Sequence, residues 1–506
     1  MMNQILVYQL SDIRVTYSGL IAVAAGLISV LTGAIFTLIV TRRLSPEEFG
    51  IWAIIGSMIS YFLIAEPIIS FWTTRQIARG EKIGRTSLFS STFFSIGSIP
   101  IYLILSFYVS QISNLQYNTV ILAALLLPVS FVSQTISSVN LGHKPHASSY
   151  GLLAFESLKI PTGLLFVYIL DLGVDGAILT TFIAFIAKII VQIYFARTQL
   201  REKFSFNVLK HWLRLSWLPL YSNLSHLIWS LDVLIYTIIT NSVIGVAYFS
   251  ISSTIAAIIG NAGLISQSVY PKLLAMGSHK HINENFTYLM YFAIPLLGIS
   301  IIFSKPALFA LNPAYKDISL IVIIYSFRTF LYVVTNTLYQ ILMGIENVDI
   351  EKTYTYKTLA KSKLFQIPTL LNIHHGVYIG SLAIILLIAS SYELNETELV
   401  TWWVVIALLI QIPFLAYASI LVKKQTAFKF PYVSTGKFAF ATLVLILIFF
   451  FTSDRIIDYQ ISIYDFLPKL ILELTICLAT YFFVTFLIDK KIRILFKSIF
   501  GELISK

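Results

Sequence analysis

The chain has few charged residues and almost no cysteine. Of its 506 residues, 12% are charged and 57% are hydrophobic, whereas soluble globular proteins carry about 25% charged residues. The single cysteine, Cys477, excludes an internal disulfide framework and a cysteine-based metal cluster. These deficits exclude a soluble globular protein and indicate an integral membrane protein.

The sequence also lacks the motifs of several enzyme classes. No Gly-rich loop ends in Gly-Lys-Ser or Gly-Lys-Thr, so ATP hydrolysis by a P-loop is not expected. The predicted outer loops are short, which argues against a glycan polymerase or ligase with a large outer catalytic domain. We expect no enzyme, no cofactor and no metal site. The net charge of +11 is better explained by membrane topology than by nucleic-acid binding.

Long apolar runs fill most of the chain. About 14 of them have the roughly 20 residues that a helix needs to cross the hydrocarbon core. They lie near 17–40, 49–72, 88–109, 117–139, 148–170, 173–196, 213–239, 244–270, 286–304, 318–343, 364–390, 399–422, 434–452 and 467–488. The expected fold is therefore an all-α integral membrane protein, with the first span retained because no removable signal peptide precedes it.

The distribution of lysine and arginine predicts the orientation. With a cytoplasmic amino terminus, most of the 35 Lys and Arg residues fall in cytoplasmic loops. Only five fall outside: Arg42, Arg43, Lys305, Lys316 and Arg455. Because cytoplasmic loops carry the excess of positive charge, we expect a multi-pass protein of the cytoplasmic membrane with both termini inside.

Two stretches about 200 residues apart resemble each other. Residues 41–50 follow the first predicted span, and residues 241–250 repeat their pattern, with Ile244 in the place of Leu44 and Phe249 in that of Phe49. Duplication of a multi-helix unit is typical of transporters built from two bundles around a central site.

The stretch 41–53 and the later segment 72–82 resemble the polysaccharide flippases of the multidrug/oligosaccharidyl-lipid/polysaccharide exporter superfamily. In that family the first span ends in an Arg-Leu-x-Pro-x-x-Phe-Gly-like turn, and the second repeat opens with a Leu-x-x-x-x-Pro helix similar to residues 213–219. The family-like turn residues here are Arg42, Arg43, Pro46, Phe49 and Gly50.

The resemblance implies two pseudo-symmetric six-helix bundles, residues 1–200 and 201–425, and two extra carboxyl-terminal helices with a basic cytoplasmic tail in 426–506. It implies a flippase for polyprenyl- or dolichyl-diphosphate-linked oligosaccharide that works by alternating access. Its expected partners are the lipid-linked oligosaccharide, membrane lipid, Na⁺ or H⁺, and glycan-assembly proteins. A cation-coupled drug or metabolite exporter of the same fold is the alternative, and a membrane glycan polymerase or ligase is a second one.

Arg328 is the first candidate for a binding site, because it lies about 15 Å into its predicted span with no acid on the same helix. A guanidinium offers forked donors to the phosphate oxygens of a diphosphate. An acid on another helix would explain Arg328 as well.

Lys159 and Lys188 are further candidate cations for the diphosphate. Glu156 precedes Lys159 by three residues, so the two side chains share a helix face and would neutralise each other. Pro161 removes a backbone hydrogen bond, which would let Lys159 turn towards a cavity instead. For Lys188, snorkelling to the cytoplasmic headgroups competes with binding.

Asp232 and Glu156 are the candidates for ion coupling, because an isolated carboxylate in the membrane needs a proton, a cation or a partner. A salt bridge between Asp232 and Arg328 is the alternative. Glu66, before Pro67, is expected to be solvated or to cap a helix. The adjacent His374 and His375 are not expected to share a metal, and His226 is expected to be a hydrogen-bonded interior residue.

The linker 197–213 is basic and amphipathic. Its cations together with Phe204, Phe206 and Trp212 fit a helix that lies on the anionic inner leaflet. An ordinary positive-inside loop is the other interpretation.

Overall fold

The computed structural model describes residues 28–29, 32–78, 80–113, 117–263, 280–344, 361–392, 394–426 and 428–493. Within these ranges the regular structure is helical, without strands. Eleven helices are long and apolar enough to cross a membrane, or up to 12 if one bent pair is counted as a single span. The predicted all-α membrane fold is confirmed. The count of 14 stays a prediction, because the segments 17–40 and 244–270 lie partly outside the described residues.

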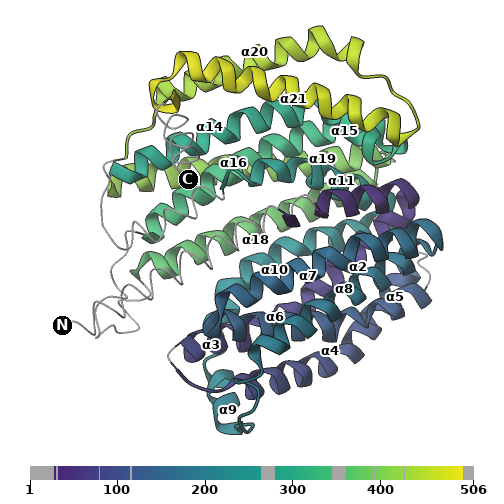
Figure 1. The fold of residues 1–506 in the computed structure, drawn as a ribbon, viewed down its shortest axis with the longest axis vertical. Helices are drawn as coiled ribbons and strands as arrows, with labels where there is room; N and C mark the ends of the chain where they lie inside the picture. Colours follow the sequence, from purple (N-terminus) through teal and green to yellow (C-terminus); the bar gives the residue numbers. More distant parts are fainter. Residues whose placement is uncertain are drawn as a thin grey trace. The chain divides into compact units, whose positions relative to one another are not determined.

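The chain forms two compact units, Met1–Ala247 and Tyr248–Lys506. The predicted bundles 1–200 and 201–425, with the extra pair in 426–506, stay a prediction. In the colour scheme of Figure 1 the first unit runs from purple to teal and the second from teal to yellow.

The first unit is built around α6. In the described part of this unit, a helical segment at residues 32–43 is followed by α2 (Pro46–Leu63), α3 (Pro67–Ala78), α4 (Gly84–Ser113), α5 (Tyr117–Ala123), α6 (Leu126–His143), α7 (Pro145–Gly163), the π-helical turn η1 (Leu164–Ile169), α8 (Gly173–Ala196), α9 (Phe206–Arg214) and α10 (Trp217–Thr240). Helix α6 packs against α3, α4, α7 and α8. Close approach depends on small residues: a Cβ on Gly151 of α7 would clash with Gln192 of α8.

Helix α11 (Ile244–Gly260) leads into the second unit. There follow α14 (Lys280–Ile302), α15 (Ser304–Leu311), the 3₁₀ turn η2 (Pro313–Ile318), α16 (Ser319–Gly344), α18 (Lys363–Ser390), α19 (Glu396–Gln425), α20 (Tyr432–Ile456) and α21 (Ile463–Ile488). Helix α16 packs on α19, and α20 packs on both α14 and α21. The Tyr481 hydroxyl donates to the carbonyl of Tyr291 at 2.6 Å. This bond, with a shared aromatic core, fixes the last helix to α14.

The predicted span 49–72 is not one straight helix. It is broken into α2 and α3, which are bent by 58°. Proline has no N–H to donate and disfavours helical geometry in the residue before it, so Pro67 begins a new helix. The carbonyl of Glu66 accepts hydrogen bonds from the N–H groups of Ile69 and Ser70. The hydropathy of the segment is uninterrupted, and this is why the break escaped prediction.

The family-like turn forms the beginning of α2. Ser45 caps the helix: its Oγ accepts from the Glu48 N–H at 3.2 Å, and the Glu48 carboxylate accepts from the Ser45 N–H at 2.9 Å. Pro46 is at the first helical position, where its missing donor costs nothing. A Cβ on Gly50 would clash with the backbone of Val243. The two stretches that resemble each other, 41–50 and 241–250, therefore contact each other at these two residues.

Candidate functional site

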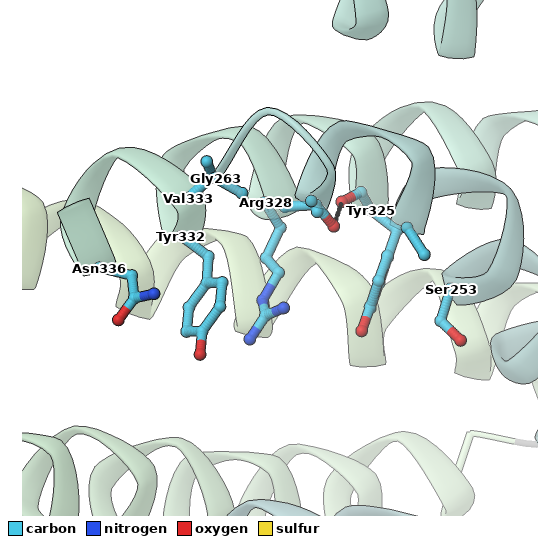
Figure 2. Close-up of a pocket in the computed structure, with 10 residues that line it drawn as sticks. Ser253, Gly263, Tyr325, Arg328, Tyr332, Val333 and Asn336 are labelled. Carbon is cyan, nitrogen blue, oxygen red and sulfur yellow. Dashed lines mark hydrogen bonds between the residues drawn. The ribbon is translucent and has the colours of Figure 1, made fainter. Parts of the chain in front are cut away.

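Arg328 lies on the face of α16 that lines a pocket of about 290 Å³. Tyr325, Arg328, Tyr332 and Asn336 recur at helical spacing, and their side chains point to the same side of the helix (Figure 2). Arg328 is only 5% exposed. The arginine singled out in the sequence is thus placed in the wall of a pocket on a membrane-spanning helix.

Helix α11 supplies the opposite part of the same pocket. Ser253, Ala257 and Gly260 share one helix face, and Gly263 follows just beyond the helix. None of these residues has a large side chain, so the space in front of the guanidinium stays open. These residues were missed in the sequence, although the run of small residues at helical spacing was a visible signal.

Two tyrosine rings flank the cation. The guanidinium carbon of Arg328 lies 4.9 Å from the ring centroid of Tyr332 and 5.5 Å from that of Tyr325. Such contacts stabilise a cation by about 0.5–2 kcal/mol without neutralising it. The two rings therefore hold the guanidinium plane in the wall of the pocket.

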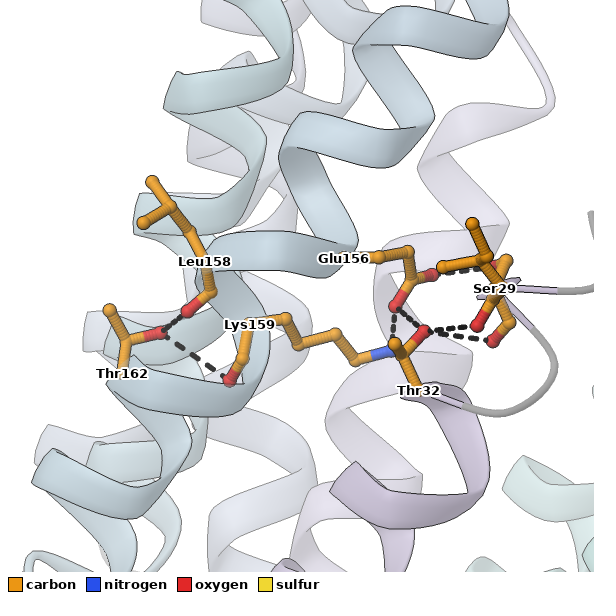
Figure 3. A network of polar contacts seen from close by, with 7 residues as sticks. Ser29, Thr32, Glu156, Leu158, Lys159 and Thr162 are labelled. Carbon is orange, nitrogen blue, oxygen red and sulfur yellow. Dashed lines mark hydrogen bonds and ion pairs between the residues drawn. The ribbon is translucent and has the colours of Figure 1, made fainter. Parts of the chain in front are cut away.

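A second charged centre lies in the first unit, around Glu156 (Figure 3). One carboxylate oxygen accepts from Ser29 at 2.6 Å, and the other accepts from Thr32 at 2.7 Å. Lys159 forms an ion pair with the second oxygen at 3.5 Å. The structure contains the neutralising pair that the spacing of Glu156 and Lys159 predicted, and it adds two hydroxyl donors from another helix.

The lysines near Glu156 are both only partly exposed. The Lys159 ammonium lies 5.0 Å from the Phe36 ring and 5.4 Å from the Phe155 ring. Lys188 of α8 is half-buried and close enough to Glu156 for electrostatic attraction. Lys159 forms the ion pair with Glu156, and Lys188 lies on α8, which packs against the α7 helix that carries both. A binding role for either lysine stays a prediction.

Asp232 is 2% exposed in α10 and belongs to the first unit, whereas Arg328 belongs to the second. Its carboxylate accepts from the Val233 N–H at 2.8 Å. Tyr61 of α2 lies within electrostatic reach of Asp232 and donates its hydroxyl to the Ser230 carbonyl at 2.7 Å. The predicted coupling role of Asp232 and its predicted salt bridge to Arg328 both stay predictions.

Three other predicted residues have environments that differ from expectation. Glu66 is 2% exposed, so its expected solvated position is wrong, whereas the capping alternative stays a prediction at this residue directly before α3; its carboxylate accepts from Thr135 of α6 at 3.0 Å. His226 is exposed rather than interior. Trp212 is fully buried rather than facing lipid, because its indole N–H donates to Gln76 at 3.0 Å.

His374 and Arg43 both contact aromatic rings. His374 and His375 are both buried, and the His374 ring lies 4.3 Å from Phe414. Arg43 of the family-like turn places its guanidinium 3.8 Å from the Tyr168 ring. Among the described residues, no group of three or more His, Cys, Asp or Glu side chains could hold a metal ion.

Glu473 of α21 is a buried acid that the sequence interpretation missed. It is fully buried and accepts a hydrogen bond from Thr452 of α20 at 2.6 Å. The signal was visible, since Glu473 is a lone acid in the last apolar run. Its hydrogen bond joins the two carboxyl-terminal helices.

Comparison with known proteins identifies solved structures that have the same fold. No protein-family model matches the chain, and no curated protein matches its sequence. Solved structures do match. The lipid II flippase MurJ, in an inward closed conformation, has a TM-score of 0.67 at 12% sequence identity, over 92% of this chain and 98% of the MurJ chain.

Two further solved structures belong to the same superfamily by their descriptions. An inward-facing multidrug resistance transporter of the MATE family and MOP superfamily has a TM-score of 0.59 at 15% identity, over 81% of this chain and 99% of its own. A MOP superfamily transporter from Pyrococcus furiosus has a TM-score of 0.50 at 14% identity, over 82% of this chain and 96% of its own. The chain has the fold of MOP superfamily transporters, as the resemblance in its motifs implied, and the likeness to the polysaccharide flippases within that superfamily stays a prediction.

Proposed function

We propose that this protein is a flippase that moves polyprenyl- or dolichyl-diphosphate-linked oligosaccharide across the cytoplasmic membrane. The fold supports a transporter, and MurJ, which has this fold, is described as a lipid II flippase. Alternating access, with each half of the transporter opening in turn, is the mode of action that such folds use. The cargo would serve the assembly of a surface polysaccharide or glycoprotein.

The observation that carries this proposal is the position of Arg328. It is buried on a membrane-spanning helix and lines a pocket, between two tyrosine rings. A buried intramembrane cation is costly unless it serves a ligand, a partner or a pathway. A diphosphate suits this site because its oxygens match the forked donors of a guanidinium.

Other residues have supporting roles in the proposal. Lys159 and Lys188 are proposed to attract the same anionic headgroup as Arg328. Asp232 and Glu156 are the proposed ion-coupling carboxylates, with Na⁺ or H⁺ as the coupling ion.

Both termini are proposed to be cytoplasmic. A cysteine introduced at Asn395 should then react with an impermeant reagent added outside; labelling only from inside would reverse the orientation.

A cation-coupled exporter of drugs or metabolites is the second candidate. It is favoured by the buried carboxylates of Glu66 and Asp232 in the first unit and by the likeness to a MATE multidrug resistance transporter. An acidic cavity would attract cationic drugs, as the Arg328 pocket would attract anions.

Transport by the purified protein in liposomes separates the two functions. The flippase should move a fluorescent polyprenyl-diphosphate oligosaccharide to the other leaflet, and Arg328→Gln should stop this movement. Cationic dyes should not accumulate. Uptake of a cationic dye driven by an ion gradient, without movement of the lipid, would contradict the flippase and support the exporter.

A further inference from the structure

The first unit contains a pocket of its own, whose polar lining residues carry no formal charge. It has a volume of about 220 Å³ and lies between α2, α6 and α10, beside Pro67 at the break between α2 and α3. Its polar side chains are Ser60, Gln134, Asn223, His226 and Ser230. No Asp, Glu, Lys or Arg is among its described lining residues. We refer to it as the neutral pocket.

Two of these side chains are exposed at depth in membrane-spanning helices. Gln134 is nine residues from the carboxyl end of α6 and His226 is nine residues from the amino end of α10, which is about 14 Å in each case at 1.5 Å per residue. Within the described part of the chain, neither side chain makes a hydrogen bond. An unsatisfied polar group in hydrocarbon costs several kcal/mol, so these groups must face water or a polar ligand.

The chemistry of the lining selects the class of ligand. Amide, imidazole and hydroxyl groups donate and accept hydrogen bonds but offer no charge to a phosphate, in contrast to the Arg328 pocket. Leu63, Ile64 and Leu227 supply an apolar wall. A sugar ring presents hydroxyl groups at its rim and C–H groups on its faces, and this combination matches the lining. Pockets for drug-sized molecules have volumes of about 300–1,000 Å³. The neutral pocket is smaller, so its volume suits a single sugar ring.

We infer that the neutral pocket binds a sugar residue of the lipid-linked cargo, through hydrogen bonds from Gln134 and His226. This inference rests on the proposed function. It separates recognition of the cargo into two parts: a diphosphate held by a cation, and a sugar read by neutral groups. A site built to hydrogen-bond a hydroxyl group discriminates strongly against an analogue that lacks it.

Transport of two lipids in liposomes tests this inference. The probes are polyprenyl diphosphate that carries an N-acetylhexosamine and the same polyprenyl diphosphate without sugar. Gln134→Leu and His226→Phe should each slow movement of the sugar-bearing probe about five- to tenfold, the effect of one lost hydrogen bond, and leave the bare probe unchanged. His226→Gln should keep most of the activity, because an amide can replace the imidazole. Ser138→Ala is the control, since the Ser138 hydroxyl donates only to its own helix.

A labelling measurement reports on the pocket without transport. Cys477, the single native cysteine, is buried, so Ser230→Cys adds a thiol that a water-soluble maleimide can report. The sugar-bearing probe should protect this thiol, and the bare probe should not. Equal protection by both probes, or by neither, would overturn the inference.

The outcomes distinguish this inference from the proposed function. If the wild-type protein moves neither probe, the flippase proposal fails and the inference fails with it. If the wild type moves both probes, and the Gln134 and His226 variants slow both equally or neither, only the sugar site is overturned. Arg328→Gln should slow both probes.

Discussion

Lys159 and Arg328 are both cations in membrane-spanning helices, but their surroundings differ. The Lys159 ammonium forms an ion pair with Glu156, whose oxygens also accept from Ser29 and Thr32. Arg328 instead lies between tyrosine rings in the wall of a pocket with small residues opposite. The carboxylate of the first centre is held by three donors within its own unit, and the cation of the second lines a pocket.

The difference teaches which cation is suited to a ligand. Removing one member of a satisfied buried pair leaves an uncompensated charge, so the cost is in folding. Removing a cation that faces a pocket alters what the pocket attracts, so the cost is in binding. The comparison therefore predicts opposite readouts at the two centres, stability at Glu156 and transport at Arg328.

The largest effect is expected at Glu156. Glu156→Ala should lower the free energy of unfolding by about 3–5 kcal/mol, because Lys159 is left without its carboxylate in a mostly buried site. The double variant, Glu156→Ala with Lys159→Ala, should recover most of the lost free energy of unfolding. Denaturant titration of the protein in detergent measures both. Thr162→Ala, whose hydroxyl donates within its own helix, is the control. A single variant as stable as wild type would remove the contrast between the centres.

The next effect concerns transport at Arg328. Arg328→Gln should reduce affinity for the lipid diphosphate about 10- to 150-fold, the value of a charge-assisted contact of roughly 1.5–3 kcal/mol. Arg328→Lys keeps the charge but loses the fork, so partial activity should remain. The measurement is flipping per molecule in liposomes, with protein abundance determined separately. Lower abundance at unchanged activity per molecule would make Arg328 a structural ion-pair partner instead.

Asp232 extends the comparison to the buried acids. If it couples transport to an ion, Asp232→Asn should make the rate independent of the ion gradient, because the amide cannot bind and release a cation or proton. A potential of 100 mV is worth about 2.3 kcal/mol per charge, so up to about a 50-fold difference in distribution would be lost. Rates measured with and without the gradient decide this. Full retention of gradient dependence would assign Asp232 a structural role.

Local spacing made part of these sites predictable. Glu156 and Lys159 are three residues apart, so their pairing followed from helix geometry, and Arg328 was recognisable as a deep cation in an apolar run. Ser29 was not recognisable as a partner of Glu156, because it reaches this centre from another helix; the small residues around Ser253 had a visible helical spacing, but this spacing did not show which helix they face. The contact between Gly50 and Val243 likewise depends on how helices pack, which spacing along one helix does not specify.

The wrong predictions for the segment 49–72 and for Trp212 have a common physical cause. The segment 49–72 has a high mean hydropathy despite Glu66, and hydropathy does not register the lost N–H of Pro67 that breaks the segment into α2 and α3. The linker 197–213 is amphipathic, but amphipathicity does not say whether the apolar face meets lipid or protein. Trp212 is buried because Gln76 offers its indole a hydrogen-bond acceptor, and only the tertiary structure brings the two together.

The smallest effect is expected from the rings beside Arg328. Tyr332→Leu removes the closer of the two rings and should weaken binding of the lipid diphosphate about two- to 30-fold, since a cation–π contact is worth about 0.5–2 kcal/mol. Tyr332→Phe keeps the ring and should bind like wild type. Tyr392→Leu, at a tyrosine that is 72% exposed and outside the pocket, is the control. Binding titrations with a short-chain prenyl diphosphate give the measurement.

If Tyr332→Phe loses as much affinity as Tyr332→Leu, the hydroxyl rather than the ring acts on the ligand. The pocket would then recognise phosphate through a hydrogen bond from tyrosine as well as through the guanidinium, and the contrast with the internally satisfied Glu156 centre would become sharper.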